Sequence, residues 1–232
     1  MEAVLQPAPL AGEHEDWLHR LGLSLSASKW SESLQGIVGK LALNTPLDLE
    51  DGVVLFNHPD LHELGALANA VREARFGRQA FFNSNVHINQ TNICVLACKF
   101  CAFRRGPKAS DAYAMSVEQY LADLAQYAHA VDEVHSVGGL HPDWDVEHYE
   151  GLFRATKEQY PHISIKALTA VEIKHLAQKS SISTKEVLRR LKEAGLTSLP
   201  GGGAEILDDD VRAQICNGKE SSQEYLQIHH HL

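Results

Sequence analysis

The stretch NICVLACKFC (residues 92–101) sets Cys94, Cys98 and Cys101 at the spacing C-x3-C-x2-C. Thiolates bind iron–sulfur clusters and zinc alike, so the ligand type does not decide between them. Structural zinc normally takes four protein ligands as two separated pairs, and the remaining cysteine, Cys216, stands alone far downstream. A [4Fe–4S] cluster held by three cysteines leaves one iron free to bind a small molecule. The spacing therefore favours such a cluster.

Two alternatives to an open iron–sulfur cluster remain at this point. The thiols could form a zinc site completed by His87 or His141, or they could pack as three small buried hydrophobic side chains. A non-catalytic iron–sulfur or zinc module would use the same residues. A disulfide framework is disfavoured, because it would spread its cysteines along the chain.

A strand–helix alternation begins just before the cysteines and continues through the rest of the chain. The strand candidates are residues 81–93, 131–137, 163–168 and 196–199. Capping-box patterns that begin at Ser116, Ser183 and Ser221 predict helix starts. This alternation predicts an α/β protein with a parallel sheet and right-handed crossovers. A complete eight-fold barrel needs about 250 residues, so we expect residues 81–232 to form an incomplete (β/α) barrel of about four units.

The N-terminal third of the chain has a different pattern. Residues 60–76 repeat apolar side chains at three- and four-residue steps, which predicts an amphipathic helix. Residues 17–43 show a similar but less regular pattern, and residues 46–51 break it. We therefore expect a helical N-terminal region, residues 1–80, ahead of the barrel core.

Composition and charge exclude several classes of protein. Hydrophobic residues make up 44% of the chain and charged residues 22%, as in ordinary globular proteins. The net charge of −9 argues against a nucleic-acid partner recognised by bulk positive charge. No run approaches the roughly 18 apolar residues that a membrane span needs, and no secretory signal is evident. We expect a cytoplasmic protein with neither a membrane nor a nucleic acid as partner.

The cysteine stretch resembles the signature of the radical S-adenosylmethionine (SAM) superfamily. Phe100 is the aromatic residue before the last cysteine, and Gly138-Gly139 follows the second predicted strand, in the order of that family's motifs. The resemblance implies a radical SAM enzyme with a partial barrel, whose cofactors are a [4Fe–4S] cluster and SAM. It implies the three cysteines as cluster ligands, Phe100 near the adenine, and a Gly138-Gly139 backbone that holds the methionine amino group of SAM.

Four further stretches narrow this resemblance. They are FNSNVHINQTNIC (82–94), GGLHP (138–142), KALTAVEI (166–173) and PGGGAEI (200–206), and they are similar to the aminodeoxyfutalosine synthases of menaquinone biosynthesis. The similarity extends over most of the chain, residues 35–228. Dehypoxanthine futalosine cyclases and the subunit of FO synthase that handles tyrosine share the cysteines and the GGGAE run. The residues His87-Ile88-Asn89 ahead of the cluster favour the synthase.

The narrower resemblance implies a specific reaction. A transferase of this kind adds the 5′-deoxyadenosyl radical to a small-molecule substrate, the enol ether 3-[(1-carboxyvinyl)oxy]benzoate, and forms aminodeoxyfutalosine. It takes an electron from an external one-electron donor such as flavodoxin or ferredoxin. In the superfamily the fifth and sixth strands help to hold the adenosine. We therefore expect a chain with about four units to ligate a cluster but to bind SAM poorly and to turn over little.

Polar side chains alternate along the first predicted strand. Those on one face are Asn83, Asn85, His87, Asn89 and Thr91. Because the outer face of a barrel meets helices, we expect this polar face to line the lumen, with His87 and Asn89 as the candidate catalytic residues. The alternative is a hydrogen-bonded structural network.

Glu205 follows three glycines at the end of the fourth predicted strand. Glycines allow a ligand to approach the backbone closely, and the carboxylate could accept hydrogen bonds from the ribose hydroxyls of SAM. We take Glu205 as a candidate cofactor-binding residue. The alternative is that its charge caps the N-terminus of the next helix.

Overall fold

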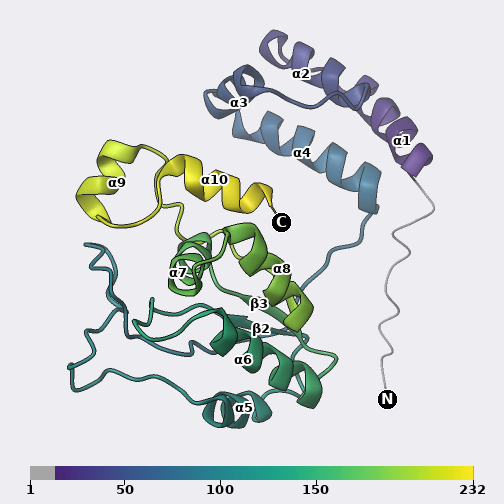
Figure 1. Cartoon of the computed structure of the whole chain (residues 1–232). Coiled ribbons are helices and arrows are strands. Elements are labelled where there is room, and N and C mark those ends of the chain that lie inside the picture. The colour runs from purple at the N-terminus through teal and green to yellow at the C-terminus, as the bar shows by residue number, and fades with distance from the viewer. Residues whose placement is uncertain (1–13, 232) are drawn as a thin grey trace. The chain divides into compact units, whose positions relative to one another are not determined.

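The computed structural model describes residues 14–231. The chain divides into two compact units, Met1–Phe81 and Phe82–Leu232. Each unit has a hydrophobic core of its own. Figure 1 shows that the described part of the first unit consists of helices and loops, whereas the second combines strands with helices.

The N-terminal unit is built from amphipathic helices. They are α1 (His14–Ser26), α2 (Glu32–Ala42), α3 (Leu49–Phe56) and α4 (Leu61–Phe76). Their buried side chains form one core, made of Leu21, Leu25, Leu34, Ile37, Leu67, Ala70 and Ala74. Asp60 caps α4, because its carboxylate accepts hydrogen bonds from the backbone N–H groups of His62 and Glu63. The predicted helical character of this region is confirmed.

Two details of this unit were not foreseen. The pattern over residues 17–43 covers two helices, α1 and α2, rather than one. The break over residues 46–51 contains a helix start. Asp48 and Asp51 form a capping box there, since each carboxylate accepts a hydrogen bond from the backbone N–H of the other. Satisfied N–H groups at this point allow α3 to begin at Leu49.

The C-terminal unit contains a four-stranded parallel sheet. Its strands are β1 (Asn85–His87), β2 (Glu133–Ser136), β3 (Ser164–Ala167) and β4 (Leu196–Ser198). The order in the sheet, β1-β2-β3-β4, follows the order in the chain. In such a sheet each helical connection leads to the neighbouring strand, as in a (β/α) barrel. The predicted α/β class with four parallel strands is confirmed.

Within the described residues of this unit, six helices accompany this sheet, and all of them except α9 contribute to a large apolar core. They are α5 (Val117–Ala125), α6 (Val146–Gln159), α7 (Ala170–Ser180), α8 (Thr184–Ala194), α9 (Asp209–Ile215) and α10 (Ser222–His230). Val134 and Ile165 of the sheet are fully buried with Phe153 of α6 and Leu191 of α8. Each such side chain contributes about 1.5–3 kcal/mol when it leaves water. Within residues 14–231, no helix has the length and apolar character needed to cross a bilayer.

The first strand is shorter than the sequence predicts. Of residues 81–93, only 85–87 belong to the sheet. Further along, Thr91 forms an isolated bridge with Ala114 and Ile93 forms one with Arg105. The segment therefore leaves the sheet and pairs with a later loop, which carries the cysteines away from the strand end.

Candidate functional site

The cysteine segment is joined by backbone hydrogen bonds to two other parts of the unit. The N–H of Val95 donates to the carbonyl of Leu140, in the loop after β2, at 3.0 Å. The N–H of Lys99 donates to the carbonyl of Ile215, at the end of α9, at 2.8 Å. Segments far apart in the sequence thus position the loop that carries the three thiols.

Thr91 is the buried centre of these connections. Its side chain is inaccessible, and its hydroxyl donates to the carbonyl of Tyr113 at 2.7 Å and accepts from the N–H of Ile93 at 3.0 Å. Its carbonyl accepts from the N–H of Gly139 at 2.9 Å. Thr91 thus belongs to a hydrogen-bonded structural network, which was the alternative to a role in the barrel lumen.

Gly138 and Gly139 lie directly against the cysteine segment. A Cβ atom on Gly139 would be 2.1 Å from the carbonyl oxygen of Ile93 and 2.9 Å from the Cβ of Cys94. A Cβ atom on Gly138 would be 2.9 Å from the side-chain nitrogen of Gln90. Only glycine allows this approach, so the end of the second strand forms a close-fitting wall beside the first cysteine.

The three thiols are free and lie at or near the surface. Cys94 and Cys98 are half-buried and Cys101 is exposed. Burial raises the pKa of the Cys98 thiol, and the nearby ammonium of Lys219 opposes this shift. Cys216, Cys94 and Cys101 also raise the pKa of this thiol, because negative charge on any of them disfavours the Cys98 thiolate.

The donor set fits an iron–sulfur cluster better than a zinc ion. In the described part of the chain, no three His, Cys, Asp or Glu side chains converge as one metal ion requires. A [4Fe–4S] cluster binds each cysteine through a different iron, so its ligands need not converge on one point. The histidines considered as a fourth zinc ligand have other contacts, since His87 stacks on His135 and His141 stacks on Trp144.

Phe100 and Glu205 both contact the ammonium group of Lys219. The Phe100 side chain is about half exposed, and the Lys219 ammonium lies 5.4 Å from the centre of its ring. The same ammonium donates to both carboxylate oxygens of Glu205, each at 2.9 Å. The helix after Glu205 is capped by Asp208, which accepts from the N–H of Val211. The alternative role of Glu205 as a helix cap is therefore wrong.

His87 belongs to a row of basic side chains on one face of the sheet. It pairs in register with His135 of β2, and the two rings stack with centres 4.9 Å apart. His135 pairs in turn with Lys166 of β3. Burial lowers the pKa of His135, and the charges of His87 and Lys166 lower it further. Asn89 lies two residues beyond His87, and its buried Oδ1 has no hydrogen-bond partner within residues 14–231.

The structure places Glu172 at the glycine pair. It is the third residue of α7, is almost fully buried, and accepts a hydrogen bond from the N–H of Gly138 at 3.0 Å. Thr169 donates to its other oxygen at 2.9 Å. Burial raises the pKa of Glu172 to about 7. The T-x-x-E pattern after the third strand was the available signal, but it indicates only a helix start.

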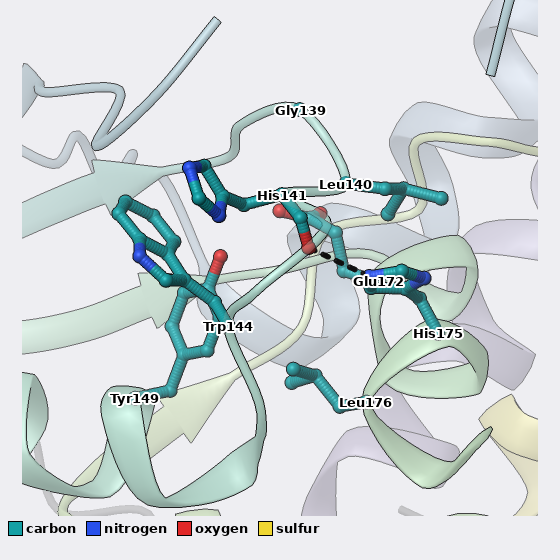
Figure 2. Close-up of a pocket in the computed structure, with 8 residues that line it drawn as sticks. All are labelled: Gly139, Leu140, His141, Trp144, Tyr149, Glu172, His175 and Leu176. Atoms are coloured by element: carbon teal, nitrogen blue, oxygen red, sulfur yellow. Dashed lines mark hydrogen bonds between the residues drawn. The ribbon is translucent and has the colours of Figure 1, made fainter. Parts of the chain in front are cut away.

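Figure 2 shows the surroundings of this carboxylate. Glu172 and His175 come from α7, and the loop after β2 passes beside them with Gly139 and His141. The ring of His175 contacts the carbonyl of His141 at 3.0 Å, through its Nε2 atom. α7 and the glycine loop are therefore linked at two points.

The sequence of this chain matches a known protein family. A family model described as the radical SAM superfamily matches residues 88–232. The chain belongs to the radical SAM superfamily. Members of this superfamily use a [4Fe–4S] cluster and SAM, so the predicted enzyme class and the predicted cofactors are confirmed. The C-x3-C-x2-C spacing of the three cysteines fits the motif of this superfamily.

Curated relatives come from several branches of this superfamily. The chain is 40% identical over 194 residues to the aminodeoxyfutalosine synthase of Thermus thermophilus. This match covers 83% of this chain and 52% of that protein. It is 36% identical over 200 residues to the cyclic dehypoxanthine futalosine synthase of Streptomyces coelicolor, covering 84% of this chain and 50% of that protein. The chain thus spans about half the length of the curated relatives it matches.

Solved structures show the same fold. A maturase of the [FeFe]-hydrogenase superposes with a TM-score of 0.65 at 13% identity, covering 92% of this chain and 46% of that one. Methylornithine synthase superposes with a TM-score of 0.59 at 16% identity, covering 91% of this chain and 55% of that one.

Proposed function

We propose that this chain carries the transferase chemistry of an aminodeoxyfutalosine synthase. When bound, the cluster and SAM would supply a 5′-deoxyadenosyl radical that adds to the enol-ether double bond of 3-[(1-carboxyvinyl)oxy]benzoate. The observation that supports this most is the 40% identity to aminodeoxyfutalosine synthases from two organisms. Rearrangement of the adduct and loss of the enol-ether carboxylate would then give aminodeoxyfutalosine, and an external donor such as flavodoxin or ferredoxin would supply the electron that cleaves SAM.

Cys94, Cys98 and Cys101 would ligate the cluster, and Gly138-Gly139 would bind the amino group of SAM. Both N–H groups of the glycine pair are used within the protein, by Glu172 and Thr91. Neither glycine carbonyl accepts a hydrogen bond from any described residue. An amino group needs acceptors, so the free carbonyls suit it.

The remaining candidates would contact the adenosine and the substrate. Phe100 would lie near the adenine, and Glu205 would bind the ribose hydroxyls after exchanging Lys219 for them. His87 would meet the substrate on the open face of the sheet, where His135 and Lys166 add basic groups that suit its carboxylates. Asn89 brings a buried oxygen that lacks a donor. The reduced thiols required for a cluster fit a cytoplasmic location.

Product analysis tests this assignment. The chain is purified without oxygen, reconstituted with iron and sulfide, and incubated with SAM, a reductant and the enol-ether benzoate. Because this chain is expected to bind SAM poorly, we expect a covalent adenosyl adduct by mass spectrometry in a lower yield than from the Thermus thermophilus synthase, and none from a variant in which all three cysteines are replaced by alanine. The Thermus thermophilus synthase, assayed in parallel, calibrates the yield. Formation of 5′-deoxyadenosine without the adduct would contradict the assignment.

A cyclase reaction is the second candidate. It is favoured by the 36% identity to cyclic dehypoxanthine futalosine synthase over 84% of this chain. A cyclase abstracts hydrogen from its substrate, so it releases 5′-deoxyadenosine instead of retaining the adenosyl group in the product. Incubation with dehypoxanthine futalosine in place of the benzoate separates the two reactions. An electron paramagnetic resonance spectrum of the cluster that SAM does not change would indicate a non-catalytic module instead.

A further inference from the structure

The glycine pair is held between two anchors on opposite sides. On one side the N–H of Gly139 donates to the carbonyl of Thr91, in the segment that leads to the cysteines. On the other side the N–H of Gly138 donates to Glu172 of α7 at 3.0 Å. The first anchor fixes Gly139, because a Cβ atom there would be 2.1 Å from the carbonyl oxygen of Ile93 and the two backbones can hardly move past each other. The position of Gly138 therefore depends on the second anchor.

Burial and hydrogen bonds hold the Glu172 carboxylate in a defined position beside the glycine pair. Its side chain is almost fully buried, and each of its oxygens accepts a hydrogen bond, one from Gly138 and one from Thr169. The N-terminus of α7 lies beside it and favours negative charge. No Lys, Arg or His within residues 14–231 forms a salt bridge with it. A cation held at the glycine pair would therefore face a carboxylate that has no other counter-ion.

We propose that Glu172, as a carboxylate, is a positioning residue that holds Gly138-Gly139 in place for the amino group of SAM. The proposal rests on the proposed cofactor role of the glycine pair and identifies what sets its geometry. A carboxylate accepts the Gly138 hydrogen bond more strongly than a neutral carboxylic acid does. The glycine pair should therefore be held more firmly when Glu172 is ionised, and binding of SAM should favour the ionised form.

Among the described residues, three other titratable side chains lie around Glu172, on α6, on α7 and in the loop after β2. Tyr149 of α6 is fully buried, and burial raises the pKa of its hydroxyl far above the physiological range. Burial lowers the pKa of His141, in the loop after β2. His175, one turn along α7, bonds to the carbonyl of His141. Burial raises the pKa of Glu172 to about 7, so this carboxyl changes its charge in the range where an enzyme works.

Hydrogen exchange of the Gly138 amide tests the proposal in the chain alone, without SAM. Protection, corrected for the intrinsic rate, is compared with that of the core amide of Val134, which reports any global destabilisation. We expect protection of Gly138 to fall at least tenfold in Glu172→Ala and to lose its pH dependence in Glu172→Gln. Glu186→Gln, at the equivalent third position of α8 but only half-buried and far from Gly138 in the sequence, is the matched control and should behave as the wild type. Unchanged protection in Glu172→Ala would overturn the proposal.

Binding of SAM to the reconstituted proteins supplies the second readout. Protonation of SAM and of the cluster affects the two proteins equally. The ratio of the wild-type affinity to the Glu172→Gln affinity therefore reports the protonation of Glu172 alone. We expect this ratio to fall by about tenfold from pH 8 to pH 6, as Glu172 takes up its proton. A constant ratio would overturn the proposal even if SAM binds. If the wild type binds no SAM at any pH, the proposed function fails for this chain, whereas the exchange experiment still decides the role of Glu172.

Discussion

Gly139 shows how one residue determines whether the cysteine segment can lie where it does. Its hydrogen takes the space in which a methyl group would meet the Ile93 carbonyl at 2.1 Å. The backbone of neither partner can move easily, because Gly139 is bonded to Thr91 and Thr91 is itself bonded to Tyr113. The close approach is therefore a property of the residue type, which explains why two glycines occur together at this point.

Gly139→Ala should lower the free energy of unfolding by about 1–3 kcal/mol, the usual cost of overpacking. It should also reduce cluster incorporation, because the methyl group displaces Cys94. Gly151→Ala is the control, since Gly151 lies inside α6 with open space around its Cα. That change should raise the free energy of unfolding by about 0.5–1 kcal/mol. Denaturant unfolding and iron analysis measure both effects, and an equally stable Gly139→Ala variant would contradict the packing argument.

Glu172 makes stability depend on pH. Its pKa rises from 4.5 in the unfolded chain to about 7 in the folded one, so the folded chain binds the proton more tightly. The resulting stability is complete below about pH 4.5 and is lost as the pH rises through 7. At about 1.4 kcal/mol per pKa unit, the loss is about 3 kcal/mol.

Glu172→Gln should therefore become more stable relative to the wild type as the pH rises from 4.5 to 7, because glutamine has no proton to release. The difference in unfolding free energy should level off above pH 7. Urea titrations at several pH values measure it. Glu186→Gln again serves as the control, because the Arg189 guanidinium lowers the pKa of Glu186 and its titration lies below this pH range. A difference that does not vary with pH would show that Glu172 titrates normally in the folded protein.

Arg212 connects α9 to the loop that carries Glu205. It lies almost fully buried in α9 and donates to the carbonyls of Ala204 and Ile206, in the loop that follows β4. It also forms a salt bridge of 2.8 Å with Glu220, whose side chain is inaccessible to solvent. The loop that carries Glu205 is thus fixed to α9 by one guanidinium group, which offers enough donors for several acceptors.

Replacing Arg212 by methionine should destabilise the protein by about 3–5 kcal/mol, because it leaves the Glu220 charge buried and unpaired. The double variant Arg212→Met, Glu220→Leu should recover part of the loss. Arg189→Met is the control, since Arg189 lies exposed on α8 and solvent screens its ion pairs, so its loss should change stability much less. Thermal unfolding distinguishes these cases, and similar losses in the two arginine variants would refute the argument.

The sequence predicts elements whose signals are local. Capping boxes beginning at Ser116 and Ser221 mark the starts of α5 and α10, as expected, because cap and partner are three residues apart. The first strand was predicted too long, since the alternation over residues 81–93 does not reveal that Thr91 pairs with a loop more than twenty residues later. The contact of Glu172 with Gly138 spans 34 residues and could not be read from either motif.

At the scale of the whole molecule, every anchor found for the cysteine segment lies in one unit. The residues that bond to it or to its base, among them Leu140, Ile215 and Gly139, all belong to Phe82–Leu232. The N-terminal unit has its own core of apolar side chains from α1, α2 and α4. The cysteine spacing predicted the cofactor without the fold, whereas the links from the cysteine segment to the loop after β2 and to α9 follow only from the three-dimensional contacts.

These hydrogen bonds predict that the second unit can hold a cluster by itself, and a specific protease site inserted between Gln79 and Ala80 tests this prediction. Residues 78–83 have no regular structure and are exposed, so the insertion should be tolerated. After reconstitution and cleavage, we expect iron and sulfide to remain with the C-terminal piece in the ratio found before cleavage. An intact protein with a scrambled, uncleavable insertion is the control. If cleavage released the iron, the N-terminal unit would be contributing to cluster stability, and the site would have to be described at the level of the whole chain.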